Sequence, residues 1–248
     1  MILKLLSYNI RFGGVGRESQ LAEVIRVVAP DLVVFQEATN PQVIEKLAHE
    51  TKMSTWAARR GHSIAFISRI EVASHRWYYP EESRHSFLEI LPAGTEARIF
   101  GLHLRARFSK WDERRRAREI RALLKALEEH QKGLHLLIGD FNTLAPGELL
   151  EVQRMPAWIR ALVWLSGRDI ERQTIQIVID AGYLDGYRLF HKEQGYTFPV
   201  WDPHLRLDYI FLPAHSADRL KSCVVINEAF ALTASDHFPL LAEVEFSN

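Results

Sequence analysis

Hydrophobic positions along the chain alternate between short continuous runs and longer segments with helical spacing. The runs at 2–8 and 32–36 predict buried strands, and the segment between them, 18–28, carries its apolar residues at helical spacing. A second helix is predicted at 41–50, because Pro41 suits the first turn of a helix. This alternation of strand and helix is typical of an α/β fold.

The middle of the chain has a different sequence pattern, in which short apolar runs are separated by turn residues. This pattern is typical of antiparallel sheets. The strands predicted there lie at 64–68, 72–78, 87–91 and 97–103. The elements predicted after them are helices at 110–130 and 169–181 and strands at 134–138, 207–212, 223–226 and 238–246. Strands that are apolar throughout indicate sheets covered on both faces. We therefore expect a mixed α/β sandwich with helices outside, formed by a single domain over 1–248.

Composition and charge narrow the class of protein. The 248 residues are 47% hydrophobic and 25% charged, as in ordinary globular proteins. Lys+Arg and Asp+Glu balance at 31 each, so attraction to a polyanion would need a local basic patch. The single cysteine, Cys223, lies in an apolar run and is expected to be buried. The chain shows neither a signal-peptide pattern nor a bilayer-length apolar run, which predicts a cytoplasmic protein.

Polar side chains of catalytic character lie just where predicted strands end. Loops at strand ends deliver such side chains to one rim of a rigid sheet. The set consists of Asn9, Glu37, His103, Asp140, Asn142, Asp208, Asp236 and His237. Carboxylate and amide oxygens suit a magnesium- or manganese-type ion, and a histidine tuned by a carboxylate suits proton transfer. Taken singly, several of these residues fit a turn, a helix cap or a structural histidine. Their joint placement indicates a hydrolytic site.

The short motifs around these residues form a recognisable series. They are Ser-Tyr-Asn-Ile-Arg at 7–11, Val-Phe-Gln-Glu at 34–37, Gly-Leu-His-Leu at 101–104, Gly-Asp-Phe-Asn at 139–142, Arg-Leu-Asp-Tyr at 206–209 and Ser-Asp-His at 235–237. In content and order the series resembles the endonuclease/exonuclease/phosphatase superfamily, which includes deoxyribonuclease-I-like nucleases, abasic-site endonucleases, sphingomyelinases and inositol phosphatases. The resemblance spans nearly the whole chain. It implies a four-layer sandwich of two packed mixed β-sheets flanked by helices.

The resemblance also implies a metal site and an oriented histidine. Glu37 would be the principal ligand of Mg²⁺ or Mn²⁺, with Asn9 close by and Asp236 completing or supporting the site. Asp208 would accept a hydrogen bond from His237 and fix the orientation of its ring.

The remaining motif residues would act on the water and the phosphate. Asp140 would orient or deprotonate the attacking water, and Asn142 would donate to a non-bridging phosphate oxygen. His103 would add a hydrogen bond to the phosphate as charge develops there. The resemblance leaves open whether Asp140 or His237 is the base, and whether one metal ion or two is bound.

Residues outside the motifs bear on the substrate. Arg11 stands where abasic-site endonucleases have an acidic residue, which argues against such a specialist and favours a phosphate contact. Arg105 and Arg107 are candidates for contacts to a phosphate backbone, whereas the arginines at 110–121 are expected to form a solvated helix face.

Two aromatic segments each allow two interpretations. Core packing is expected for Trp158 and Trp164, and an exposed apolar lip that meets a lipid or a partner is the alternative. The aromatic residues at 196–201 either line a substrate wall and stack on a base or pack as part of a strand.

The sequence thus predicts a metal-dependent phosphoesterase that hydrolyses a phosphodiester, with a nucleic acid or nucleotide-like substrate favoured. The alternatives are a phospholipid or sphingolipid phosphodiesterase and a phosphatase of small molecules. A catalytically silent binding protein on the same scaffold is less favoured, because every expected polar group is present. No obligate protein partner is indicated.

Overall fold

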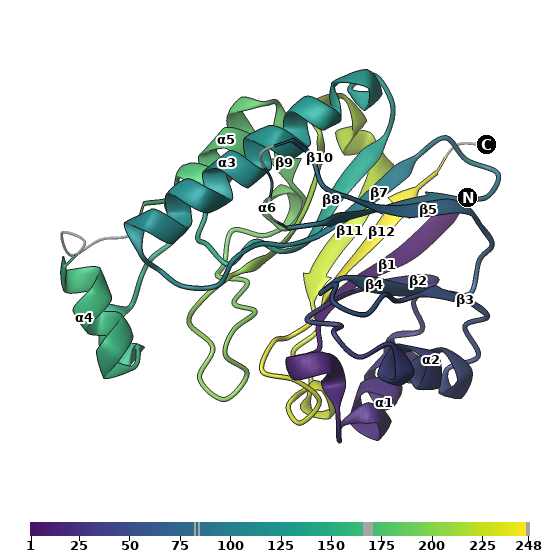
Figure 1. The fold of residues 1–248 in the computed structure, drawn as a ribbon, viewed down its shortest axis with the longest axis horizontal. Helices are drawn as coiled ribbons and strands as arrows, with labels where there is room; N and C mark the ends of the chain where they lie inside the picture. The colour runs from purple at the N-terminus through teal and green to yellow at the C-terminus, as the bar shows by residue number, and fades with distance from the viewer. Residues whose placement is uncertain (82, 84, 166–170, 247–248) are drawn as a thin grey trace.

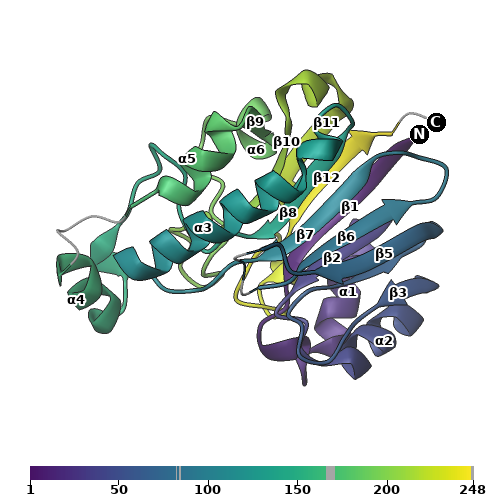
Figure 2. The ribbon, with the colours of Figure 1, turned by 45° about the horizontal axis from the view of Figure 1, so that its top comes forward.

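The computed structural model of the chain describes residues 1–81, 83, 85–165 and 171–246, and two six-stranded mixed sheets form its centre (Figures 1 and 2). The first sheet, in the order β11-β12-β1-β2-β4-β3, consists of β11 (Leu220–Val225), β12 (Leu240–Glu245), β1 (Ile2–Asn9), β2 (Leu32–Gln36), β4 (Ala65–Ser68) and β3 (Thr55–Ala57). The second, in the order β5-β6-β7-β8-β10-β9, consists of β5 (Val72–Tyr78), β6 (Phe87–Pro92), β7 (Arg98–His103), β8 (His135–Asp140), β10 (Asp208–Pro213) and β9 (Tyr183–Asp185). In each sheet one central pair is parallel, β1 with β2 and β7 with β8.

Helices cover the outer face of each sheet (Figure 2). The helices α1 (Glu18–Val28) and α2 (Pro41–Glu50) share a buried apolar cluster with the first sheet. The helices α3 (Lys110–Ala126) and α5 (Gln173–Asp180) share another with the second sheet. A third cluster fills the space between the two sheets. These layers confirm the predicted four-layer α/β sandwich.

Local sequence features fix the close approach of the sheets and the starts of the helices. A Cβ atom at Gly101 in β7 would lie 2.8 Å from Cγ1 of Val34, so the missing side chain lets the two sheets meet there. The side chains of Asn40 and Ser109 accept backbone N–H hydrogen bonds in the first turns of α2 and α3. Each cap of this kind contributes about 1 kcal/mol.

The observed elements follow the predicted ranges closely, with a few differences. The helix predicted at 110–130 ends at Ala126, and a separate 3-10 turn, Glu128–His130, follows it. The helix predicted at 169–181 is observed as α5, and its predicted start at 169–170 lies outside the described residues. The sequence pattern does not indicate β3 and β9, because three residues are too few to show a period. Within the described ranges, no helix is both long and apolar enough to cross a bilayer.

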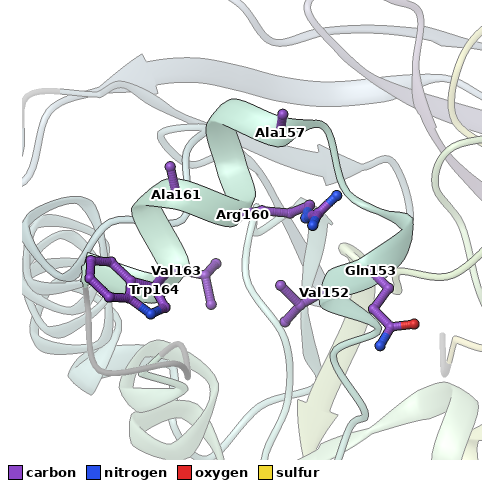
Figure 3. A pocket seen from close by; sticks show the side chains of 7 residues that line it. All are labelled: Val152, Gln153, Ala157, Arg160, Ala161, Val163 and Trp164. Carbon is purple, nitrogen blue, oxygen red and sulfur yellow. The ribbon is translucent and has the colours of Figure 1, made fainter.

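The expectation that Trp158 and Trp164 pack in the core is wrong. Both lie on α4 (Ala157–Leu165), which projects from one end of the molecule, and they are 58% and 63% exposed (Figure 1). The helix is anchored instead through Val163, which is buried in a small cluster with Leu205 and Leu207. A cavity of about 620 Å³ lies beneath α4, with Val163 on one side and the preceding 3-10 turn on the other (Figure 3).

Cys223 is fully buried in β11, as the sequence predicts. Burial raises the pKa of its thiol well above the ordinary value, which suppresses the reactive thiolate. We expect the thiol to be inert to a disulfide reagent such as dithionitrobenzoate in the folded protein at pH 8 and to react when the chain is unfolded in guanidinium. Immediate stoichiometric reaction without denaturant would contradict this burial.

Candidate active site

Strand register brings the predicted polar residues to one rim of the paired sheets. In the second sheet, His103 at the end of β7 lies beside Asp140 at the end of β8, and Asp208 at the start of β10 pairs with Asp140 on its other side. In the first sheet, β1 ends at Asn9 and β2 is followed by Glu37. The site is therefore assembled from strand ends of both sheets.

A histidine and a carboxylate form a buried pair in this site. Nδ1 of His237 donates to Oδ2 of Asp208 at 2.8 Å. Burial by itself disfavours the imidazolium, but the charge and hydrogen bond of Asp208 outweigh it and raise the pKa of His237 to about 9. The Phe198 ring lies 4.7 Å from the imidazole, centre to centre, and so limits the movement of His237. The structure thus brings His237 and Asp208 together as the sequence predicts.

Asp140 is held by three donated hydrogen bonds. Its Oδ1 accepts the backbone N–H of Asn142 at 2.8 Å, and its Oδ2 accepts the side-chain amides of Asn9 at 3.0 Å and Asn142 at 2.9 Å. Burial raises the pKa of Asp140 to about 7, and the negative charge of Asp208 adds to this effect. The carboxylate is therefore fixed in position, and its proton affinity is raised.

Asn142 has its amide occupied in the structure. Besides the bond to Asp140, its Nδ2 donates to the carbonyl oxygen of Leu104 at 2.9 Å. Asn142 adopts a φ of 52°, which asparagine tolerates better than most residues. The geometry makes Asn142 an orienting residue for Asp140. The phosphate contact expected from the sequence would have to replace one of these bonds.

Glu37 is presented to the rim by an unusual backbone conformation. Its φ of 55° lies in the left-handed region, and its carbonyl oxygen accepts the N–H groups of Gly13 at 2.9 Å and Thr39 at 2.8 Å. Its side chain accepts the N–H of Phe12 at 2.7 Å and faces Nδ2 of Asn9 at 3.4 Å. The contact between Asn9 and Glu37 joins the ends of β1 and β2.

The donor set at this rim fits a hard divalent cation. Carboxylate oxygens such as those of Glu37 are the ligands that magnesium and manganese prefer. The amide oxygen of Asn9 accepts the N–H of Arg11 at 2.9 Å, so Asn9 would have to turn its amide or bind the ion through a water. Asn9 contacts both Glu37 and Asp140, so two negative groups converge on one amide. Asp140 is buried next to the partly exposed Glu37, and a metal ion held by Glu37 would supply positive charge that compensates both carboxylates.

A second group with metal-ligand chemistry consists of Asp140, Asp208 and His237, whose ligand atoms lie within 4.8 Å of one another. The Nδ1 proton of His237 is already donated to Asp208, and an ion in this group would compete with that bond. We therefore interpret the group as a proton-handling unit and place the candidate cation at Glu37 and Asn9.

His103 lies at the edge of the same unit. Its Nε2 is 3.9 Å from Oδ2 of Asp140, which is too long for a hydrogen bond. Burial lowers the pKa of His103 to about 4, even though the negative charge of Glu37 opposes the shift. His103 is thus a neutral imidazole at neutral pH and can donate one hydrogen bond to a substrate oxygen.

Two residues expected to contact substrate or metal are paired with each other. Nε of Arg11 lies 3.2 Å from Oδ2 of Asp236. The neighbouring Ser235 donates to the backbone oxygen of Asn9 at 2.7 Å, which ties the segment before β12 to the end of β1. Binding of a phosphate by Arg11, or of a metal by Asp236, would rearrange this ion pair. The pair is a feature that the motifs do not reveal.

Arg105 is likewise engaged within the chain. Its Nε donates to Oδ1 of Asp112 at 2.7 Å. Arg116 holds the loop that carries Arg105 and Arg107, because its Nη1 donates to both of their carbonyl oxygens at 2.7 Å. Arg116 is 1% exposed, so the expectation of a solvated face for the whole arginine-rich segment is wrong at this position.

The partner of Arg116 connects this loop to the segment that follows β8. Glu113 accepts from Nη2 of Arg116 at 2.8 Å and from Oγ1 of Thr143 at 2.9 Å. Its other oxygen accepts the N–H of Thr174 at the start of α5 at 2.7 Å. Sequence reasoning misses this network, because its members look like ordinary charges of an exposed helix. One sequence signal could have indicated this network. Glu113 and Arg116 are three residues apart on the same side of α3 as its buried apolar residues.

Replacing Arg116 by methionine is expected to lower the free energy of unfolding by about 3–5 kcal/mol, because Glu113 would remain buried without its cation. Urea unfolding followed by circular dichroism measures the change. Arg118→Met removes the same charge from an exposed position of α3 and should stay within about 0.5 kcal/mol of wild type. Equal stability of the two variants would contradict the structural role of the pair.

Comparison with known proteins agrees with this geometry. The sequence model of the endonuclease/exonuclease/phosphatase family matches residues 6–237. No curated protein sequence matches the chain significantly. Among solved structures, a 3'-5' exonuclease from Neisseria meningitidis aligns over 98% of this chain and 100% of its own, with a TM-score of 0.76 and 23% identity.

An abasic-site (AP) endonuclease from Archaeoglobus fulgidus aligns over 98% of this chain and 99% of its own, with a TM-score of 0.75 and 18% identity. A Neisseria 3' phosphatase bound to a product DNA hairpin aligns over 98% and 99%, with a TM-score of 0.73 and 22% identity. These similarities establish the shared fold, and the family match extends from β1 to the Ser-Asp-His segment at 235–237. The chain therefore belongs to the endonuclease/exonuclease/phosphatase family.

Proposed function

We propose that the protein is a divalent-metal-dependent phosphodiesterase that hydrolyses a nucleic acid or nucleotide-like substrate. The observation that carries the proposal is the meeting of the Asp208–His237 pair, the fixed carboxylate of Asp140 and the Asn9–Glu37 contact at one rim. A phosphodiester and hydroxide repel each other, so catalysis needs charge compensation and precise placement of a water. The site offers groups for both tasks.

Each residue has a defined task in this proposal. Glu37 would hold a magnesium- or manganese-type ion with Asn9 close by, and the ion would supply positive charge to the phosphate. Asp236 would support the site if Arg11 exchanged its ion pair for the substrate. Asp140, fixed by its three hydrogen bonds, orients the attacking water and accepts its proton.

The imidazoles act on the phosphate oxygens. His237, oriented by Asp208, presents its free ring edge to the phosphoryl group and stabilises the charge that develops there. His103 adds a neutral hydrogen bond from the end of β7. Asn142 keeps Asp140 in place and reaches the phosphate when its bond to Leu104 is exchanged.

The choice of nucleic acid as substrate rests on the family and on the neighbours. Members of the family hydrolyse phosphate esters, generally with divalent metal ions, and the similar structures include an exonuclease, an abasic-site endonuclease and a phosphatase bound to DNA. Arg11, Arg105 and Arg107 lie on the loops of this rim and supply cationic side chains for phosphates.

The test is hydrolysis of plasmid DNA, end-labelled linear duplex and single-stranded oligonucleotide, a phospholipid mixture and small phosphomonoesters, each with magnesium, manganese or EDTA. We expect metal-dependent cleavage of nucleic acid that is lost in Asp140→Ala. Asp218→Ala, which removes an exposed acidic residue beyond the opposite end of β10, is the matched control and should remain active. Metal-dependent release from another substrate class alone would reassign the substrate.

A lipid phosphodiesterase is the second candidate, and the exposure of α4 favours it. Trp158, Trp164 and Leu165 are 58%, 63% and 73% exposed on a helix whose one charged residue is Arg160. Tryptophan and a flanking cation suit the interface of a bilayer. Val163 anchors this helix in a cluster with Leu207, the residue before Asp208.

Vesicle sedimentation separates the two candidates. A lipid enzyme should bind phosphatidylcholine/phosphatidylglycerol vesicles and lose binding and lipid hydrolysis together in Trp158→Ala/Trp164→Ala. A nuclease should bind DNA more weakly as salt rises, with a slope set by the number of phosphate contacts, and the double variant should leave that slope unchanged.

A further inference from the structure

A cavity of about 440 Å³ opens beside the candidate metal site, and no motif of the sequence indicates it. Its lining comes from the segment before β4, from the connection between β5 and β6, and from the loop after β7. Glu37 and His103 form the end of the cavity that faces the catalytic rim. The side chains that line the rest include His62, Ser63, Tyr79, His85, Ser86 and Arg107. Its volume lies in the range of small-ligand sites.

The far wall of this cavity is aromatic and preorganised. Nδ1 of His62 is 2.9 Å from Oγ of Ser86, which fixes the plane of the imidazole. The Tyr79 ring lies 5.9 Å from this imidazole, centre to centre, and the residue is 57% exposed. The Trp77 ring lies 5.7 Å from the same imidazole, centre to centre. An exposed ring on a fixed aromatic base is a stacking surface for a planar group.

The charge around the cavity favours a neutral planar group over a second phosphate. His85 is within 2.9 Å of both carboxylate oxygens of Glu119, and Arg105 is paired with Asp112. Glu37 adds a negative charge at the catalytic end. The cations of the lining are therefore largely balanced within the chain, while Ser63 and Ser86 supply hydrogen-bonding groups.

We propose that this cavity is a nucleobase subsite, in which the base of the nucleotide next to the scissile phosphate stacks on Tyr79, whose ring packs against the buried His62. The proposal rests on the proposed nucleic-acid phosphodiesterase function and specifies its substrate: a nucleotide unit with an unpaired base, as in a single strand or at a frayed end. A base held in a duplex cannot enter a lateral pocket without leaving its stack. Arg107, exposed beside the pocket, lies on the path of the adjoining phosphates.

The test compares two substrates that share the scissile diester and differ in the base. Tyr79→Ala should lower kcat/KM for a single-stranded oligonucleotide by about 5- to 150-fold, the range of one base–aromatic stack. It should leave kcat/KM for the same oligonucleotide with abasic sites on both sides of the scissile phosphate within about 2-fold. Tyr79→Phe should restore the oligonucleotide activity, because the ring is kept. Phe190→Ala removes an exposed aromatic side chain of α6 (Gly186–Phe190) outside the cavity and should match wild type on both substrates.

A double-mutant cycle identifies the base that is bound. An abasic analogue is placed in turn on either side of the scissile phosphate. At one of the two positions it should lower kcat/KM of the wild-type protein by the same factor as the Tyr79→Ala substitution does. Tyr79→Ala should show no further loss with that substrate. Independent losses, or full oligonucleotide activity of a folded Tyr79→Ala, would overturn the subsite while leaving the phosphodiesterase intact. Metal-dependent cleavage of bis(p-nitrophenyl) phosphate without cleavage of any oligonucleotide would overturn the nucleic-acid substrate and the subsite together.

Discussion

The His237→Ala variant is expected to hydrolyse the diester substrate about 10²- to 10³-fold more slowly than wild type, the range typical of losing one donor that stabilises charge in the transition state. Its affinity for manganese should change by less than about 3-fold, because the imidazole is committed to Asp208 and the phosphate rather than to the cation. Steady-state kinetics gives the first quantity, and Mn²⁺ binding followed by electron paramagnetic resonance gives the second. Full turnover in the variant would show that the assigned mechanism is wrong.

Asp208→Asn is the companion variant for this experiment. Asp208 is the largest influence that raises the pKa of His237, so its neutralisation is expected to lower this pKa from about 9, with Asp140 and Asp236 still opposing the effect of burial. At pH 7.5 a smaller fraction of the imidazole should therefore be protonated in the variant than in wild type. Titration of the His237 ring proton by NMR in metal-free buffer detects this change. A pKa that stays near 9 in Asp208→Asn would mean that another group holds the proton.

Much of the fold can be predicted from the sequence because its signals are strong and local. The apolar run of β2 and the helical spacing in α1 give the observed bounds without adjustment. The segment around α4 shows the limit of such reasoning. A window that is apolar nearly all round normally lies in a core, and only the tertiary arrangement shows that Trp158 and Trp164 remain exposed while Val163 anchors the helix.

The same distinction applies to the residues of the candidate site: some can be placed from the sequence, and others only from the structure. Residues inside motifs, such as His237 and Asp208, can be placed from the sequence because the strand ends that carry them are fixed by register. Contacts between loops have no periodic signal. The Arg11–Asp236 pair and the support of the 104–107 loop by Arg116 depend on side chains that meet only after both sheets have formed.

The Glu37→Gln variant is expected to raise the magnesium concentration needed for half-maximal activity by at least about 10-fold. Loss of an orienting partner alone typically costs 10- to 100-fold in metal affinity, and Glu37 is the proposed ligand itself. Glutamine keeps the shape of the side chain and an oxygen that can accept the N–H of Phe12, so the turn at this position should persist. The change therefore removes charge from the cation site with little change in structure.

Calorimetric titration with Mn²⁺ measures this loss of metal affinity independently of turnover. In the activity assay, high magnesium should restore a large part of kcat, because Asp140 and His237 remain in place. Glu45→Gln on the exposed face of α2 removes the same charge close by in sequence and should leave metal binding unchanged. A comparison of Glu37→Gln with Asp208→Asn also separates the two candidate positions of the ion. If Glu37→Gln binds Mn²⁺ as tightly as wild type while Asp208→Asn does not, the cation lies among Asp140, Asp208 and His237, and the assignment of Glu37 is wrong.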